Sequence, residues 1–133
     1  MNINKIKTVA VIDDDDIYQY TVKKTIKSTQ LVNNIVTFSD GLEAVDFFIA
    51  NLERPNELPD LVFLDLDMPI LDGWQFLEEY TSFKNKIKKD IAIYVTSSSQ
   101  NPDDLIQAKN ISEVSDYIVK PLTFERFKEI MRA

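Results

Sequence analysis

The chain has 133 residues, of which 44% are hydrophobic and 28% charged, and its formal net charge is −7 at pH 7. This size and composition fit one globular domain over residues 1–133. The absence of cysteine and histidine excludes disulfides, thiolate or imidazole metal ligands and a Ser-His-Asp triad, and the negative charge argues against nucleic acid or membrane partners.

The sequence offers no segment that would cross or enter a membrane. Its longest unbroken apolar run, Ile91–Val95, is far too short to span a bilayer. The N-terminus lacks the apolar stretch of a signal peptide. We therefore expect a cytoplasmic protein.

Five short segments are predicted to be strands. They are near-continuous apolar runs without polar alternation, which is typical of parallel strands covered on both faces. The fifth run is the weakest. The segments are Thr8–Ile12, Ile35–Phe38, Leu61–Leu64, Ile91–Val95 and Tyr117–Val119.

Segments with the apolar spacing of helices lie between and after these strands. Expected helix caps are Asp16 for the first, Asn101 for the fourth and Thr123 for the last. A βα unit repeated five times predicts an α/β fold, a five-stranded parallel sheet with helices on both faces. The expected apolar faces are Tyr18, Val22 and Ile26; Ala44, Val45 and Phe48; Trp74, Leu77 and Tyr80; and Phe124, Phe127 and Met131.

Carboxylates follow the first and third predicted strands directly. In open sheets of strand order 2-1-3-4-5 these two strands are neighbours, and ligands bind beyond their carboxyl ends. We therefore expect Asp13, Asp14 and Asp65 to converge. Their mutual repulsion favours a hard divalent cation, and Mg²⁺ suits a site with few carboxylates. Asp15 and Asp16 are expected only to cap the following helix.

Complementary side chains follow the last two predicted strands. Thr96 begins a run of hydroxyl residues after the fourth strand, and Lys120 follows the fifth, just before Pro121. A carboxylate nucleophile, a cation, a hydroxyl group and a lysine together indicate phosphoryl transfer to an aspartate.

With these motifs the chain resembles the receiver domain of two-component response regulators over about residues 7–131. The resemblance implies a flavodoxin-like receiver fold of strand order 2-1-3-4-5 and a phosphorylatable signalling switch, not an enzyme acting on other substrates. The motifs are Val11-Ile-Asp-Asp14, Leu64-Asp-Leu-Asp-Met-Pro69, Asp72-Gly73, Val95-Thr-Ser97 and Tyr117-Ile-Val-Lys-Pro121.

The resemblance also implies roles for the acids. Asp65 matches the phosphoacceptor, and Asp14 and Asp65 match the carboxylates that bind Mg²⁺ directly. The backbone carbonyl of Asp67 matches a third protein ligand of the metal. Asp13 matches the acid that holds a metal-bound water.

Other matched positions concern the switch. Lys120 matches the lysine that pairs with the acceptor and then with its phosphoryl group. Thr96 matches the hydroxyl that moves toward that group, and Tyr117 the aromatic that turns inward, from a half-buried resting position. The resemblance further implies a cis Lys120–Pro121 bond. Gly73 is expected to have a positive φ.

The implied activity is Mg²⁺-dependent transfer from the phosphohistidine of a histidine kinase or histidine phosphotransfer protein to Asp65. Slow autodephosphorylation and a conformational change on the face of the fourth helix, fifth strand and fifth helix would follow. Because the chain has no histidine, the donor must be another protein. The downstream target, and the choice between a stand-alone regulator and a phosphorelay link, stay open.

Two other functions are compatible with parts of the sequence. An apolar strand followed by Asp65-Leu66-Asp67 also fits the first motif of haloacid-dehalogenase-type phosphatases. Alternatively, the chain is a pseudo-receiver that acts only as a docking module. Turnover of a phosphate ester would favour the phosphatase, and stoichiometric labelling the receiver.

Overall fold

The computed structural model describes residues 6–132. Its five strands form one parallel sheet of order β2-β1-β3-β4-β5, which confirms the expected fold and strand order. The expectation of one domain over residues 1–133 stays a prediction, and residues 1–5 and 133, on which it partly falls, lie outside the described residues. The strands are β1 (Ile6–Ile12), β2 (Val32–Phe38), β3 (Leu61–Asp65), β4 (Ala92–Ser97) and β5 (Val114–Val119).

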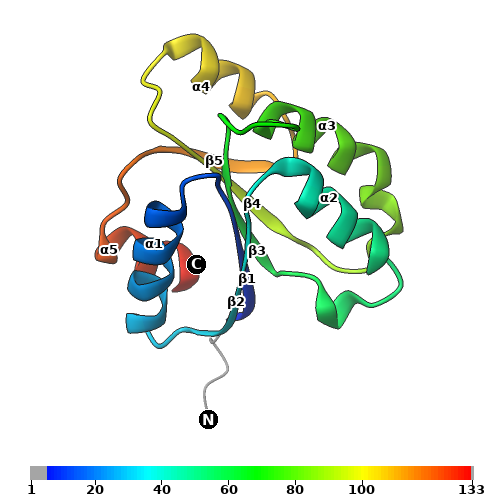
Figure 1. Ribbon diagram of the computed structural model, residues 1–133, viewed down its shortest axis with the longest axis horizontal. Helices are drawn as coiled ribbons and strands as arrows, with labels where there is room; N and C mark the ends of the chain where they lie inside the picture. Colours follow the sequence, from blue (N-terminus) through cyan, green and yellow to red (C-terminus); the bar gives the residue numbers. More distant parts are fainter. Residues whose placement is uncertain (1–5, 133) are drawn as a thin grey trace.

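Helices cover both faces of this sheet. Figure 1 shows α1 and α5 on one face and α2, α3 and α4 on the other. Within residues 6–132, no helix combines the length and the apolar character needed to cross a membrane. The helices are α1 (Asp16–Ser28), α2 (Gly41–Ala50), α3 (Gly73–Phe83), α4 (Pro102–Lys109) and α5 (Phe124–Arg132), with 3₁₀ turns η1 (Pro55–Glu57) and η2 (Lys84–Lys86).

The sheet separates two hydrophobic cores. On the α2–α3 face, the ring of Phe48 packs edge-on against Phe76 and Tyr80, with centroids 5.7 and 5.9 Å apart. On the α1–α5 face, Phe127 packs edge-on against Phe63 of β3 at 5.2 Å. Burial on both faces explains why the central strands have no polar alternation.

The two outer strands are longer than predicted. β2 begins at Val32, opposite Ile6 of β1, and β5 begins at Val114, opposite Ile93 of β4. Each outer strand has a neighbour on one side only, so polar residues are tolerated along it. These polar residues interrupt the apolar runs on which the prediction was based.

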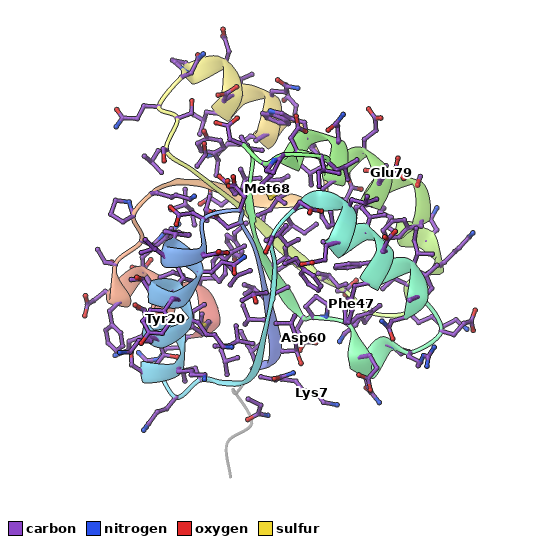
Figure 2. The ribbon with its side chains drawn as sticks, viewed as in Figure 1. Lys7, Tyr20, Phe47, Asp60, Met68 and Glu79 are labelled. Carbon is purple, nitrogen blue, oxygen red and sulfur yellow. The ribbon has the colours of Figure 1, made fainter. Side chains whose placement is uncertain are left out.

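Two separate ion pairs lie at the amino end of the sheet. Lys89 lies 2.8 Å from Asp60 and also donates hydrogen bonds to two backbone carbonyls before β3. Lys84 forms an ion pair with Glu113, and this hydrogen bond holds the pKa of the Glu113 carboxyl below its usual value. Figure 2 labels Asp60 at this end of β3 and Met68 toward the opposite end.

Candidate functional site

Strand register brings the predicted acids together at the carboxyl end of the sheet. β1 and β3 are paired with Ile12 level with Leu64, so the residues that follow them emerge side by side. Carboxylate oxygens of Asp13, Asp14 and Asp65 lie within 4.8 Å of one another. Asp13 and Asp65 are buried and Asp14 is exposed. The predicted convergence is confirmed.

The neighbouring strands bring Thr96 and Lys120 to the same end. Thr96 is level with Asp65 in the β3–β4 pair and is buried. The backbone N–H of Lys120 donates to the carbonyl of Ser97 at 2.8 Å. The ammonium of Lys120 lies 2.7 Å from Asp13 Oδ2 and 3.3 Å from Asp65 Oδ1. The Lys120–Pro121 bond is cis, as the resemblance implied.

One ammonium does not balance this group of acids. Burial and the charge of Asp13 raise the pKa of Asp65 from 3.8 to about 6, against the opposing effect of Lys120. Burial lowers the pKa of Lys120, but the hydrogen bond to Asp13 and the charges of both carboxylates outweigh it, so its pKa lies above the ordinary value. Unrelieved like charge of this kind is typical of a functional site.

The donor set at this end fits Mg²⁺. Hard divalent cations take oxygen ligands, and three converging carboxylates supply them together with the negative charge that a cation would neutralise. The Asp67 side chain is exposed and is not part of the convergent group found within residues 6–132. Only its backbone carbonyl, as the resemblance implies, is a candidate ligand.

The N-cap of the helix that follows the acids lies one residue earlier than expected. Asp15, and not Asp16, is the N-cap of α1, accepting a hydrogen bond from the Tyr18 N–H at 3.0 Å. Asp16 is the first helical residue. Either acid fits the positive end of the helix dipole, so the sequence pattern does not distinguish them. The expected caps Asn101 and Thr123 accept hydrogen bonds from backbone N–H groups two and three residues later.

The role expected of Gly73 is wrong. No glycine among the described residues has a positive φ, and the unusual backbone in this loop is at Ile70, with φ 69°. Gly73 is required for a different reason. A Cβ atom there would lie 2.4 Å from the Asp65 carbonyl oxygen and 2.7 Å from Leu66 Cα. The glycine therefore lets α3 begin against the backbone of the candidate acceptor.

Tyr117 is more deeply buried than expected. The side chain was predicted to be half-buried, but the residue is 7% exposed. Its hydroxyl donates a hydrogen bond to the backbone carbonyl of Ser99 at 2.9 Å, in the loop that follows β4. This bond links β5 directly to the segment that leads from Thr96 into α4.

Two residues of α1 contribute to the site in ways that the sequence analysis missed. The ring of Tyr18 lies 4.2 Å from the ammonium of Lys120, and burial raises the pKa of its phenol to about 12. The side-chain amide of Gln19 donates to the carbonyls of Asp13 and Phe38, joining α1 to the ends of β1 and β2. Their position, two and three residues after the acidic run, was the available signal.

The fold and the site define an α/β domain with converging carboxylates at the carboxyl end of its sheet, and comparison with known proteins identifies its family. The chain matches the response regulator receiver domain over residues 9–132. A two-component response regulator from Cytophaga hutchinsonii has a TM-score of 0.85 at 28% identity, with 95% of this chain and 94% of that chain covered.

Two further comparisons involve metal-bound proteins. Response regulator Rcp1 of Synechocystis is 29% identical over 118 residues, covering 88% of this chain and 78% of Rcp1. Its Mn²⁺-bound form has a TM-score of 0.74 at 25% identity, covering 95% and 89% of the two chains. A chain of the CheX–CheY–BeF₃–Mg²⁺ complex from Borrelia burgdorferi has a TM-score of 0.73 at 26% identity, covering 94% and 84%.

The chain therefore belongs to the response regulator receiver domain family. Receiver domains are phosphorylatable switches of two-component signalling and not conventional enzymes. They bind Mg²⁺ in an acidic pocket and interact with histidine kinases and downstream targets.

Proposed function

We propose that Asp65 accepts a phosphoryl group from the phosphohistidine of a histidine kinase or histidine phosphotransfer protein, in a Mg²⁺-dependent reaction. The convergence of three carboxylates with Lys120 carries this proposal. An Asp65 oxygen forms a bond to phosphorus while the bond from phosphorus to the imidazole nitrogen breaks, and the electron pair of that bond remains on the nitrogen. The product is an aspartyl phosphate.

The residues around Asp65 suit it to this attack. Its pKa of about 6 leaves it mainly ionised at pH 7, so no general base is needed. Asp14, Asp65 and the Asp67 carbonyl would hold Mg²⁺, with Asp13 beside them. Bound there, the cation supplies positive charge against the phosphoryl oxygens. Lys120, already 3.3 Å from Asp65, needs little movement to reach the same oxygens.

The same proposal extends to the response. Thr96 is level with Asp65 in the sheet, so a short movement would bring its hydroxyl to the phosphoryl group. Tyr117 would respond through the loop to which it is hydrogen-bonded. The changed face of α4, β5 and α5 would then bind the downstream protein. We also include slow autodephosphorylation and a cytoplasmic location in this proposal.

Names of relatives support the chemistry. One comparison structure is a complex with BeF₃ and Mg²⁺, and another is a Mn²⁺-bound form. BeF₃ is a mimic of the phosphoryl group. The phosphatase alternative loses support because its motif requires the second acid at the site, whereas the side chain of Asp67 is exposed outside the convergent group.

Intact-mass measurement after incubation with acetyl phosphate and Mg²⁺ tests the proposal. We expect wild type to gain the mass of one phosphoryl group, and we expect no gain for Asp65→Asn or in EDTA. Equal labelling of Asp65→Asn would contradict the assignment of the acceptor. No labelling of wild type under saturating donor would favour the docking module, and continuous release of phosphate from a generic phosphate ester would favour the phosphatase.

A further inference from the structure

Tyr18 lies against the cation of the site. Its ring centroid is 4.2 Å from the Lys120 ammonium, which also contacts the carboxylates of Asp13 and Asp65. The backbone N–H of Tyr18 is bonded to the N-cap Asp15, which fixes this residue in the first turn of α1. The ammonium is therefore enclosed by two carboxylates and one aromatic face.

We propose that Tyr18 is a positioning residue for phosphoryl transfer: its ring covers a further side of the Lys120 ammonium and holds it at the two carboxylates. The inference rests on the proposed function of Asp65, because the position of Lys120 matters only if the lysine takes part in the transfer. A lysine has a flexible four-carbon stem and a strongly hydrated head. An aromatic face attracts the ammonium and leaves less of it open to water.

The side chain of Lys120 is mostly buried, with 15% of its surface exposed. Water that replaced the ring would compete with the carboxylates for the ammonium protons and would let the stem sample other rotamers. Pre-positioned charge is what stabilises a phosphoryl-transfer transition state. Loss of the ring should therefore slow the transfer, although it removes neither a carboxylate nor the lysine.

The phenol hydroxyl is separable from the ring. Tyr18→Phe removes the hydroxyl and keeps the aromatic face, whereas Tyr18→Leu removes both. The two variants therefore distinguish the proposed role from a role of the hydroxyl.

The same helix provides a matched control. Tyr20 is 64% exposed, and its ring lies 5.4 Å from the ammonium of Lys24. Figure 2 shows the labelled Tyr20 on the outer side of α1. Tyr20→Leu makes the same chemical change in the same helix, next to a lysine that is remote from the acids.

The first measurement is the NMR resonance of the Lys120 ε-methylene protons, assigned by its absence from Lys120→Met. The ring current of a tyrosine over the ammonium shifts this resonance upfield. We expect the upfield shift in wild type, Tyr18→Phe and Tyr20→Leu, and its loss in Tyr18→Leu. An unshifted resonance in wild type overturns the proposal, and this measurement does not depend on the folding of any variant. An upfield shift that survives in Tyr18→Leu also overturns it.

The second measurement is the rate of labelling by acetyl phosphate at saturating Mg²⁺, followed by intact mass. We expect Tyr18→Leu to be slower by about tenfold, or about 1.4 kcal/mol, and Tyr18→Phe and Tyr20→Leu to react like wild type. Equal rates for Tyr18→Leu and wild type overturn the positioning role. Absence of labelling in wild type overturns the proposed function instead, and the NMR result then decides the position of Lys120 by itself.

Discussion

At the amino end of the sheet two acids each pair with a different lysine, whereas at the carboxyl end two of three converging acids pair with the same lysine. Lys89 pairs with Asp60 and Lys84 with Glu113. At the other end Lys120 is the shared partner of a convergent group of carboxylates. The pKa values follow the difference, because Glu113 is held below its usual value and Asp65 is raised to about 6.

The glycines of the chain are also concentrated at the carboxyl end. The sequence has two, Gly41 and Gly73. A Cβ atom at Gly41 would lie 2.4 Å from the Leu71 carbonyl oxygen, and one at Gly73 equally close to that of Asp65. Both allow backbone segments to approach closely around the loop after β3. The paired charges of the amino end favour stability, whereas the carboxyl end combines like charges with closely packed backbone, an arrangement suited to binding a cation.

Removal of the shared cation should have the largest effect on stability. Lys120→Met leaves the buried carboxylates of Asp13 and Asp65 without a counter-charge. We expect its free energy of unfolding in EDTA to fall by about 3 kcal/mol. Lys84→Met breaks a more exposed pair and should cost about 1 kcal/mol or less. Urea denaturation at pH 7 measures both, and equal losses would remove the contrast between the two ends.

The pH dependence of stability gives a somewhat smaller effect. In EDTA the pKa of Asp65 is about 6 in the folded protein against 3.8 ordinarily. Between these values the folded protein binds more protons than the unfolded chain, so stability decreases as the pH rises. We expect the titration of Asp65 to lower the free energy of unfolding by about 2–3 kcal/mol as the pH rises from about 4 to about 7.

Asp65→Asn lacks this titration and serves as the reference. The difference in unfolding free energy between wild type and Asp65→Asn, measured in urea at each pH, isolates the contribution. This difference should be smallest near pH 4. As the pH rises to 7, Asp65→Asn should become increasingly more stable relative to wild type. A difference that does not change with pH would show that Asp65 titrates normally.

Gly73→Ala should have a smaller but specific effect. The new methyl group would meet the Asp65 carbonyl oxygen at 2.4 Å, so the backbone must shift. We expect a loss of about 1–3 kcal/mol and slower labelling by acetyl phosphate. Ser82→Ala, on the exposed side of α3, should change stability by about 0.5 kcal/mol or less. An unchanged labelling rate in Gly73→Ala would show that Asp65 tolerates movement of α3.

Much of the fold follows from local sequence pattern. The buried strands β1, β3 and β4 are apolar runs, and their carboxyl ends were located to within two residues. The starts of β2 and β5 could not be predicted, because outer strands tolerate polar residues that interrupt such runs. The strand order itself came from the resemblance and not from the pattern.

The site residues were predictable where the residue type and its place after a strand indicate a chemical role. Acids after two neighbouring strands imply convergence, but the spacing of Tyr18 with Val22 and Ile26 indicates only a core face. Its contact with Lys120 depends on how α1 packs beside the end of β5, which is a tertiary feature. The steric reason for Gly73 likewise depends on the approach of α3 to Asp65.

The most direct test of the charge imbalance is the sign of two melting-temperature changes in EDTA at pH 7 and matched ionic strength. Asp65→Asn removes a charge that its surroundings disfavour, and Glu113→Gln removes one that they favour. We expect Asp65→Asn to melt a few degrees higher than wild type and Glu113→Gln lower. Millimolar Mg²⁺ should stabilise wild type and Glu113→Gln more than Asp65→Asn. A lower melting temperature for Asp65→Asn in EDTA would contradict the claim that repulsion between the carboxylates at this end of the sheet destabilises the metal-free protein.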